Sequence, residues 1–307
     1  MTHFFTHPCF LDHDTGAHHP ERPDRLRAVL GALDAPEFEG LERLDAPAAT
    51  REQIERVHPS AQVDGVLKAV PQAGLGHIDA DTVVSPGSGQ AAFHAAGALC
   101  AAVDVVAKGT ASNGFCAVRP PGHHAEPSRA MGFCLFNSVA IGAMQARAIH
   151  GLKRVAVIDV DVHHGNGTQA FAWEDPDFFY ASTHQMPLYP GSGSVAERGV
   201  GNIVNVPLSP GADGEAFRSV VTETVIPALR RFAPEIVMIS AGFDAHARDP
   251  LANLNLVADD YAWVTRELML VADEFAGGRV VSCLEGGYDL EGLAESAAAH
   301  VRSLMAD

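Results

Sequence analysis

Residues 159–166 combine acids, imidazoles and glycines in a spacing that suits metal chemistry. They follow a short β-branched apolar run, residues 155–158, which is typical of a strand buried on both faces of a parallel sheet. Side chains alternate along an extended chain, so Asp159, Asp161 and His163 share one side. Buried carboxylates need a partner, and Asp-x-His offers an oxygen and a nitrogen to one small cation. A metal site is the first interpretation, and an N-capping aspartate followed by turn histidines is the alternative.

Three other segments carry reactive side chains just after a predicted strand. Residues 119–126 read Arg-Pro-Pro-Gly-His-His-Ala-Glu, and the prolines and glycine give the pair His123 and His124 a stiff support. Asp244 follows a predicted strand over 234–242, and Tyr288 follows a Gly-Gly pair after a strand over 279–284. Ligands bind at the carboxyl ends of strands in parallel sheets, so these side chains are predicted to meet at one edge.

Strands and helices alternate along the chain, which predicts a mostly parallel sheet covered by helices on both faces. Further strands are expected at 115–118, 177–183 and 202–208. Helices are expected at 23–33, 50–70, 89–107, 138–150, 214–231, 258–275 and 290–305, with Asn137 capping the fourth. Composition does not shift along the chain and no Ser/Gly-rich linker appears, which favours one catalytic domain over residues 1–307.

The composition limits the class of protein. Hydrophobic residues make up 47% of the chain, enough for a sizeable core. The formal charge of −17 argues against direct nucleic-acid binding and would attract cationic substrates. No run is expected to span a membrane, and the first residues lack a signal-peptide pattern, so a cytoplasmic location is predicted. Five cysteines without regular spacing argue against a disulfide framework.

The first thirty residues leave two questions open. Their five histidines are irregularly spaced, which favours a solvated loop over a metal site: His3, His7, His13, His18 and His19. Arg22 and Arg25 lie at the predicted helix 23–33. An arginine near a metal pocket can hold a product carboxylate. A surface pair on a helix is slightly favoured by the sequence alone.

The strand-end clusters together indicate metal-assisted amide hydrolysis. Asp161, His163 and Asp244 supply three ligands and leave a fourth position for water, as a catalytic zinc requires. The neighbouring histidine pair can take the proton of that water and return it to a leaving amine. Asp159 and Asn166 are suited to hold the far nitrogens of that pair. A tyrosine hydroxyl on a Gly-Gly turn can donate to the developing oxyanion.

Five motifs in order resemble the histone deacetylase family, specifically its class II-like bacterial members, a group that includes acetylpolyamine amidohydrolases. They are RPPGHHA, GFCLFN, DVDVHHGNGTQ, SAGFDAHARDPL and LEGGY. The resemblance extends from residues 19–21 to the last helix. It implies the arginase/deacetylase fold, a single eight-stranded parallel sheet flanked by helices on both faces.

The resemblance also implies roles for individual residues. It places Zn²⁺ on Asp161, His163 and Asp244. It makes His124 the main general base, assisted by His123 through Asp159, with Asn166 where class I members have an aspartate. It gives Tyr288 the stabilisation of the transition state.

Other assignments by resemblance concern substrate and a second ion. The walls of an acyl-lysine tunnel match Gly132, Phe133 and Tyr189. A structural K⁺ would use Asp159 and Ser182 with the carbonyls of Asp161, His163 and Thr183. Arg25 matches an arginine of the acetate channel, although Arg22 competes for that position.

The predicted function is removal of acetyl or other short acyl groups from acylated lysine or similar amines. Acetylpolyamine deacetylation is the closest alternative. Polyamine-selective relatives carry an acidic residue after the Asp-Pro of the third ligand motif, where this chain has Leu251, so acyl-lysine peptides are favoured. An arginase-like ureohydrolase would need a second metal, and a non-catalytic reader would be expected to lack the tyrosine or a histidine. The physiological substrate, the acyl-chain preference, homo-oligomer formation and the choice of Zn²⁺ or Fe²⁺ stay open.

Overall fold

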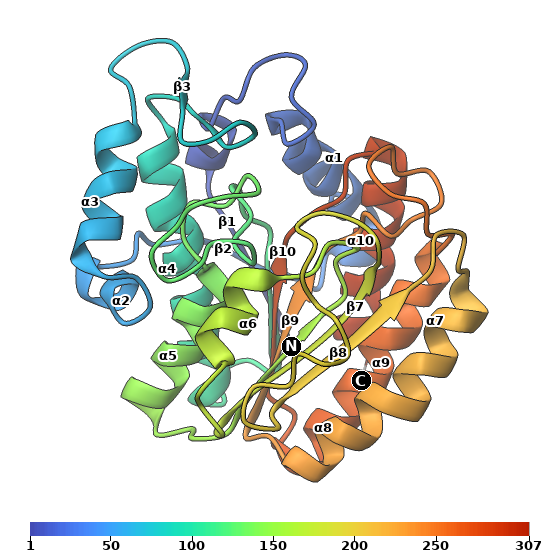
Figure 1. Cartoon of the computed structure of the whole chain (residues 1–307). Helices are drawn as coiled ribbons and strands as arrows, with labels where there is room; N and C mark the ends of the chain where they lie inside the picture. Colours follow the sequence, from blue (N-terminus) through green and yellow to red (C-terminus); the bar gives the residue numbers. More distant parts are fainter. Residues whose placement is uncertain (307) are drawn as a thin grey trace.

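The computed structural model describes residues 1–306 and contains an eight-stranded, all-parallel sheet (Figure 1). The strand order is β2-β1-β5-β10-β9-β6-β7-β8. The strands are β1 (Thr2–Thr6), β2 (Glu42–Asp45), β5 (Asn113–Cys116), β6 (Val155–Asp159), β7 (Phe178–Gln185), β8 (Ile203–Leu208), β9 (Ile236–Ala241) and β10 (Val280–Leu284). A separate antiparallel pair joins β3 (Gly76–His77) to β4 (Val83–Val84). The predicted eight-stranded parallel sheet is confirmed.

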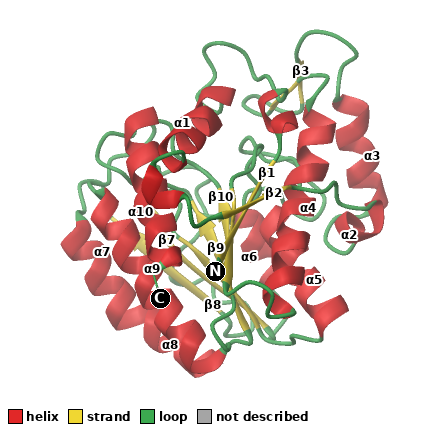
Figure 2. Cartoon of the chain, turned by 180° about the vertical axis from the view of Figure 1, so that it is seen from behind, coloured by secondary structure: helices red, strands yellow, loops and turns green. Residues whose placement is uncertain are grey.

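Helices cover both faces of the sheet, as Figures 1 and 2 show. One layer contains α2 (Arg51–Glu55), α3 (Ser60–Ala69), α4 (Ser88–Ala107), α5 (Ser138–His150) and α6 (Asn166–Ala172). The other contains α1 (Pro23–Leu33), α7 (Gly214–Val220), α8 (Ile226–Phe232), α9 (Ala258–Phe275) and α10 (Leu290–Met305). Asn137 caps α5 as predicted, since its Oδ1 accepts the N–H of Ala140 at 3.0 Å.

Several predicted element boundaries differ from the structure for local physical reasons. The helix expected over 50–70 is two helices: α2 ends at Glu55, and Pro59, in an extended conformation, is the N-cap of α3 and keeps the two from joining. The helix expected over 214–231 contains a π-helical turn, Val221–Val225, between α7 and α8. Strands β1 and β2 were not predicted. Strand β2 lies at the sheet edge and reads Glu-Arg-Leu-Asp, without the apolar pattern that reveals buried strands.

The helix α4 corrects the prediction that no segment has the length and apolarity of a membrane span. It has 20 residues and a mean hydropathy of 1.4 over its most apolar window, of which 61% is buried inside the protein. The helix packs against α5 and β5. Its apolar composition is therefore explained by packing in the core.

The predicted solvated N-terminal loop is wrong for most of its histidines. His3 lies in β1 and is buried, and His13 is buried against Ser88 and Glu21. His7 and His19 are half-buried, and only His18 of the five is exposed. Irregular spacing hid these contacts because the partners of each histidine lie far away along the chain.

Candidate active site

Four adjacent strands, β5, β10, β9 and β6, end in the predicted site residues. His123 and His124 follow β5, and Tyr288 follows β10. Asp244 follows β9, and the segment with Asp161 follows β6. Because parallel strands share one carboxyl edge, residues more than a hundred positions apart meet there. The structure thus brings the predicted cluster together.

The three predicted metal ligands form a compact buried group. Nδ1 of His163 lies 3.1 Å from Oδ1 of Asp161 and 3.0 Å from Oδ2 of Asp244. Both aspartates are fully buried, and His163 is 8% exposed. Zinc binds nitrogen and carboxylate oxygen at about 2.0–2.2 Å, so donors this close together can share one ion. The donor set of two oxygens and one nitrogen fits a metal of this kind.

The charges of this group are poorly balanced by the protein itself. Burial and then the charge of Asp161 raise the pKa of Asp244 to about 7. Burial opposes ionisation of Asp161 too, but the nearby His123 and His163 hold its pKa below the usual range. Burial disfavours the charged form of His163, yet hydrogen bonds to both aspartates raise its pKa to about 10. Two buried carboxylates thus compete for one imidazole, an arrangement that a bound cation would neutralise.

The two histidines of the tandem pair have different partners. Nδ1 of His123 donates to Oδ2 of Asp159 at 3.0 Å, and Nδ1 of His124 donates to Oδ1 of Asn166 at 2.8 Å. Burial lowers the pKa of His123, but the charges of Asp159 and Asp161 more than offset it and raise that pKa well above its usual value. Burial and the neighbouring His123 hold the pKa of His124 well below its usual value. His124 is therefore neutral, with Nε2 free to accept a proton.

Arg25, and not Arg22, lies beside Tyr288. The Arg25 guanidinium is fully buried and donates to the carbonyls of Gly287 and Glu285, at 2.5 Å each. Its central carbon lies 4.8 Å from the centroid of the Tyr288 ring. Arg22 is partly exposed and pairs with Asp24. The favoured interpretation of a surface pair is thus wrong for Arg25.

The predicted tunnel-wall residues lie around the histidines and Tyr288. The Phe133 ring is 5.9 Å from the Tyr288 ring, and the Tyr189 ring is 5.1 Å from the His124 ring. Gly132 has a positive φ of 56°, and a Cβ there would lie 2.6 Å from Cδ2 of His124. A side chain at Gly132 would thus displace the proposed base.

The structure gives fewer contacts for Leu251 and for the predicted potassium ligands Ser182 and Thr183. Leu251 is half-buried, and its N–H donates to Asp249 at 3.0 Å. Ser182 pairs with Asp159 in the register of β7 on β6, but its hydroxyl contacts His184. Among the described residues, the buried hydroxyl of Thr183 has no hydrogen-bond partner. The potassium assignment stays a prediction.

Three residues that support the site were not identified from the sequence. Glu285 is fully buried and accepts the N–H groups of Gly122, at 2.7 Å, and His123, at 3.1 Å. Asp249 accepts the N–H of Tyr288 at 2.7 Å, and the hydroxyl of Tyr180 donates to Asp159 at 3.0 Å. Glu285 directly follows β10, so the strand-end rule that found Tyr288 could also have found this carboxylate.

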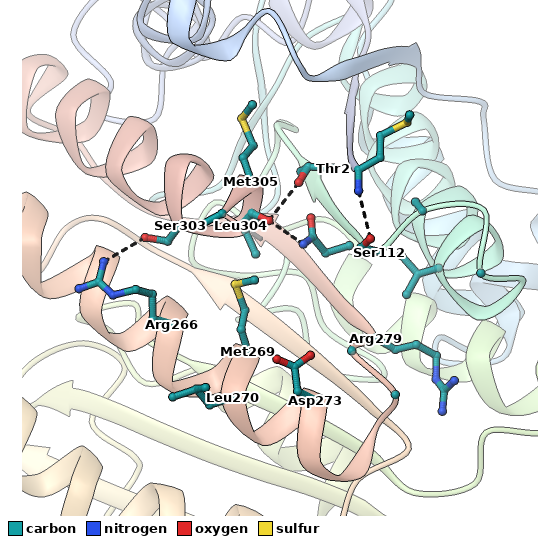
Figure 3. A pocket seen from close by; sticks show the side chains of 18 of the residues that line it. Thr2, Ser112, Arg266, Met269, Leu270, Asp273, Arg279, Ser303, Leu304 and Met305 are labelled. Carbon is teal, nitrogen blue, oxygen red and sulfur yellow. Dashed lines mark hydrogen bonds between the residues drawn. The ribbon is translucent and has the colours of Figure 1, made fainter.

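A pocket of about 830 Å³ opens at the opposite, amino end of the sheet (Figure 3). It is lined by Thr2, Asn113, Met269, Leu270 and Arg279, among others. None of the predicted site residues lines it. The reactive side chains and this cavity therefore lie at different ends of the strands.

Comparison with known structures defines the class. The crystal structure of the HDA15 HD domain matches with a TM-score of 0.93 at 36% identity, over 99% of this chain and 89% of that chain. The protein therefore has the arginase/deacetylase fold.

The sequence comparisons identify the family. The histone deacetylase domain matches residues 19–304. Histone deacetylase 14, chloroplastic, of Arabidopsis thaliana is 42% identical over 94% of this chain and 73% of that protein. The histone deacetylase-like amidohydrolase of Pseudomonas aeruginosa is 41% identical over 89% of this chain and 73% of that protein. The chain belongs to the histone deacetylase family, and its chemistry is that of a deacetylase or amidohydrolase.

Proposed function

We propose that the protein is a zinc-dependent deacetylase that removes acetyl or other short acyl groups from acylated lysine. The observation that carries the proposal is the convergence of Asp161, His163 and Asp244 on one buried point. His124 and Tyr288 lie at the ends of neighbouring strands. When bound there, Zn²⁺ supplies Lewis acidity toward the amide carbonyl and makes water more acidic.

The side chains of this chain would carry the proton transfers. Neutral His124 accepts a proton from the attacking water as its oxygen bonds to the carbonyl carbon. The Tyr288 hydroxyl donates to the oxyanion that forms. When the C–N bond breaks, the proton passes to the leaving amine, and the products are a carboxylate and a free amine. His123, charged through its contact with Asp159, adds positive potential beside the reacting oxygen.

Buried Arg25 is suited to interact with the carboxylate product. Its guanidinium keeps its charge, since Glu21 raises its pKa against the opposing effect of burial. It donates to the carbonyls of Glu285 and Gly287, which holds it beside the Tyr288 turn. Both features support the predicted acetate channel.

Acetylpolyamine deacetylation is a second candidate because acidic residues lie near the mouth. The N–H of Phe133 donates to the hydroxyl of Thr82 at 3.2 Å, and Thr82 is hydrogen-bonded to Asp79 and Asp81, so both carboxylates belong to a segment that contacts the predicted tunnel wall. They would attract a distal ammonium. Leu251 favours the lysine substrate instead, since it offers no charge to a desolvated ammonium. We give more weight to Leu251, because selectivity depends on desolvated contacts more than on steering.

Parallel kinetics with an acetyl-lysine peptide and N-acetylputrescine test this choice. We expect a higher kcat/KM for the peptide, and we expect Leu251→Glu to narrow or reverse the difference. Leu270→Glu is the matched control, because it adds the same charge at an exposed position on α9, away from the site. A preference of the unmodified protein for the polyamine would reject the lysine substrate and leave the metal-dependent hydrolase in place.

Three further parts of the proposal rest on the sequence and on resemblance. They are a structural K⁺ near Asp159, Ser182 and Thr183, a single catalytic domain over residues 1–307, and a cytoplasmic location. Each stays a prediction, as does the number of chains in the assembly.

A further inference from the structure

A second group of potential metal ligands lies outside the site described above. It consists of His7, Cys9 and His94, and one ligand atom from each lies within 4.8 Å of the others. His7 directly follows β1, and Cys9 is in the short 3₁₀ helix Pro8–Leu11. His94 lies in the second turn of α4. The group therefore joins two elements that are more than eighty residues apart.

The protonation of the two rings suits metal binding. Nδ1 of His94 lies 2.7 Å from the carbonyl oxygen of Ala46, so this nitrogen carries the proton and Nε2 carries the lone pair. Nδ1 of His7 accepts the N–H of Cys9 at 3.1 Å, so the proton of the neutral ring is on Nε2 and a metal would take the Nδ1 lone pair in place of this hydrogen bond. The rings are stacked, with centroids 4.2 Å apart. Two charged imidazolium rings would repel at this distance, whereas neutral imidazole is the form that binds metals.

The cysteine supplies the soft ligand. Cys9 is 3% exposed, and its sulfur makes no hydrogen bond within the described part of the chain. Burial, followed by the charge of Asp12, raises the pKa of the Cys9 thiol to about 12. The thiol is therefore unsuited to act as a nucleophile or redox sensor, which require an accessible thiolate. A metal would displace its proton.

We propose that His7, Cys9 and His94 form a second zinc site, structural and separate from the catalytic one. Two imidazoles and one thiolate are typical zinc ligands, unlike the oxygen-rich catalytic set. Zinc would hold such donors roughly 3.3–3.8 Å apart. The observed limit of 4.8 Å means that the donors must approach by about an ångström. The half-buried rings of His7 and His94 have the freedom to turn, and a water can complete the coordination.

The proposed ion would fasten the start of the chain to α4. The end of β1 and α4 carry no covalent link, since all five cysteines are free. A metal that binds these donors in the folded chain and not in the unfolded one would add its binding free energy to the stability of that region. Its contribution would be to stability, with no part in the chemistry at the carboxyl ends of β6 and β9.

Cobalt spectroscopy on the full chain, purified without a histidine tag, separates the two sites. Co²⁺ chloride is added to metal-free protein, and the thiolate-to-cobalt charge-transfer band in the near ultraviolet is recorded. Of the two ligand groups, only the one with Cys9 contains a thiolate, because the catalytic ligands are oxygen and nitrogen. We expect the band to saturate with Co²⁺, and we expect Asp244→Asn to keep it while losing one bound equivalent.

His94→Ala is the decisive variant, because this half-exposed residue can change without opening the core. We expect it to remove the band and one equivalent of Co²⁺. His77→Ala, at an exposed position, is the matched control and should change neither. Cys9→Ser should reproduce the loss, whereas Cys100→Ser should not. Absence of the band in the unmodified protein, or its persistence in His94→Ala, would overturn the proposal.

Discussion

Two buried clusters of charge in this protein are built on opposite principles. In the first, Glu21 is held by two arginines: Arg119 donates to both of its oxygens, at 2.5 and 2.7 Å, and Arg25 donates at 3.0 Å. Burial opposes ionisation of Glu21, but Arg119 keeps its pKa well below the usual value. In the second, Asp161 and Asp244 share the imidazole of His163, and His123, which is already paired with Asp159, lies 3.8 Å from Asp161. The first cluster has two guanidinium groups for one carboxylate, and their remaining N–H groups donate to main-chain carbonyls, whereas the second has an excess of carboxylates that a cation would neutralise.

The two clusters are expected to have different roles, one in stability and one in catalysis. The Glu21 cluster fixes Arg25 beside the Tyr288 turn through hydrogen bonds to Glu21 and to the carbonyls of Gly287 and Glu285. The Asp161 cluster leaves donor atoms directed at one point, next to the histidine pair. We therefore expect changes in the first cluster to affect stability and changes around the second to affect turnover.

The largest effect on turnover is expected beside the metal cluster. Tyr288→Phe removes the donor to the oxyanion and should lower kcat by about 10²–10³-fold. His124→Ala should be at least as damaging, and His123→Ala less so, because His124 is the neutral base. Steady-state kinetics with an acetyl-lysine peptide measure these effects, and unfolding curves check that the variants are folded. Equal, mild losses in all three variants would show that the roles are misassigned.

A large effect on stability is expected in the Glu21 cluster. Glu21→Gln leaves Arg25 and Arg119 buried without their carboxylate, which should cost about 3–5 kcal/mol of unfolding free energy. Asp24→Asn is the control, since the Arg22–Asp24 pair is exposed and worth less than about 1 kcal/mol. Denaturant unfolding measures both. Similar losses in the two variants would contradict the contrast between the clusters.

The smallest expected effect is a pH dependence of the unfolding free energy, caused by a buried histidine that the folded protein keeps neutral. Nε2 of His58 accepts the N–H of Asn137 at 2.9 Å, and burial lowers the His58 pKa to about 4. The unfolded chain, with its ordinary pKa near 6.5, binds the proton first. The contribution of His58 to the unfolding free energy is therefore fully present above about pH 6.5. It decreases as the pH falls toward 4, by at most about 1.4 kcal/mol per pH unit.

The variant His58→Gln isolates this contribution. Its unfolding free energy should fall by roughly 1 kcal/mol less than that of the unmodified protein between about pH 7 and 5.5. His77→Gln, exposed on β3, should behave like the unmodified protein. An unchanged pH dependence in His58→Gln would show that His58 is not the responsible group.

The sequence predicted the second cluster because its residues sit in motifs at strand ends. Asp161 and His163 are two positions apart, and Asp244 follows a run of buried apolar residues. Periodicity also predicted α9 and α10 with their observed bounds. Parallel topology then brought the motifs to one edge.

The contacts of the first cluster left no comparable signal in the sequence. Glu21 and Arg119 are 98 positions apart, and no spacing marks them as a pair. Arg22 and Arg25 look alike in the sequence, and only the packing of α1 buries one of them. His94 lies on an alanine-rich helix, so its proximity to Cys9 depends on how α4 packs against the end of β1. Such contacts are set by tertiary packing.

Zinc removal and return test the central claim most directly, with His94→Ala as the background so that only the catalytic site is counted. We expect metal-free protein to deacetylate an acetyl-lysine peptide no faster than a buffer control. One equivalent of Zn²⁺ per chain should restore full activity, and none should return when Asp244→Asn is added. Full activity without metal, or recovery only with two equivalents of Mn²⁺, would contradict a single zinc held by Asp161, His163 and Asp244.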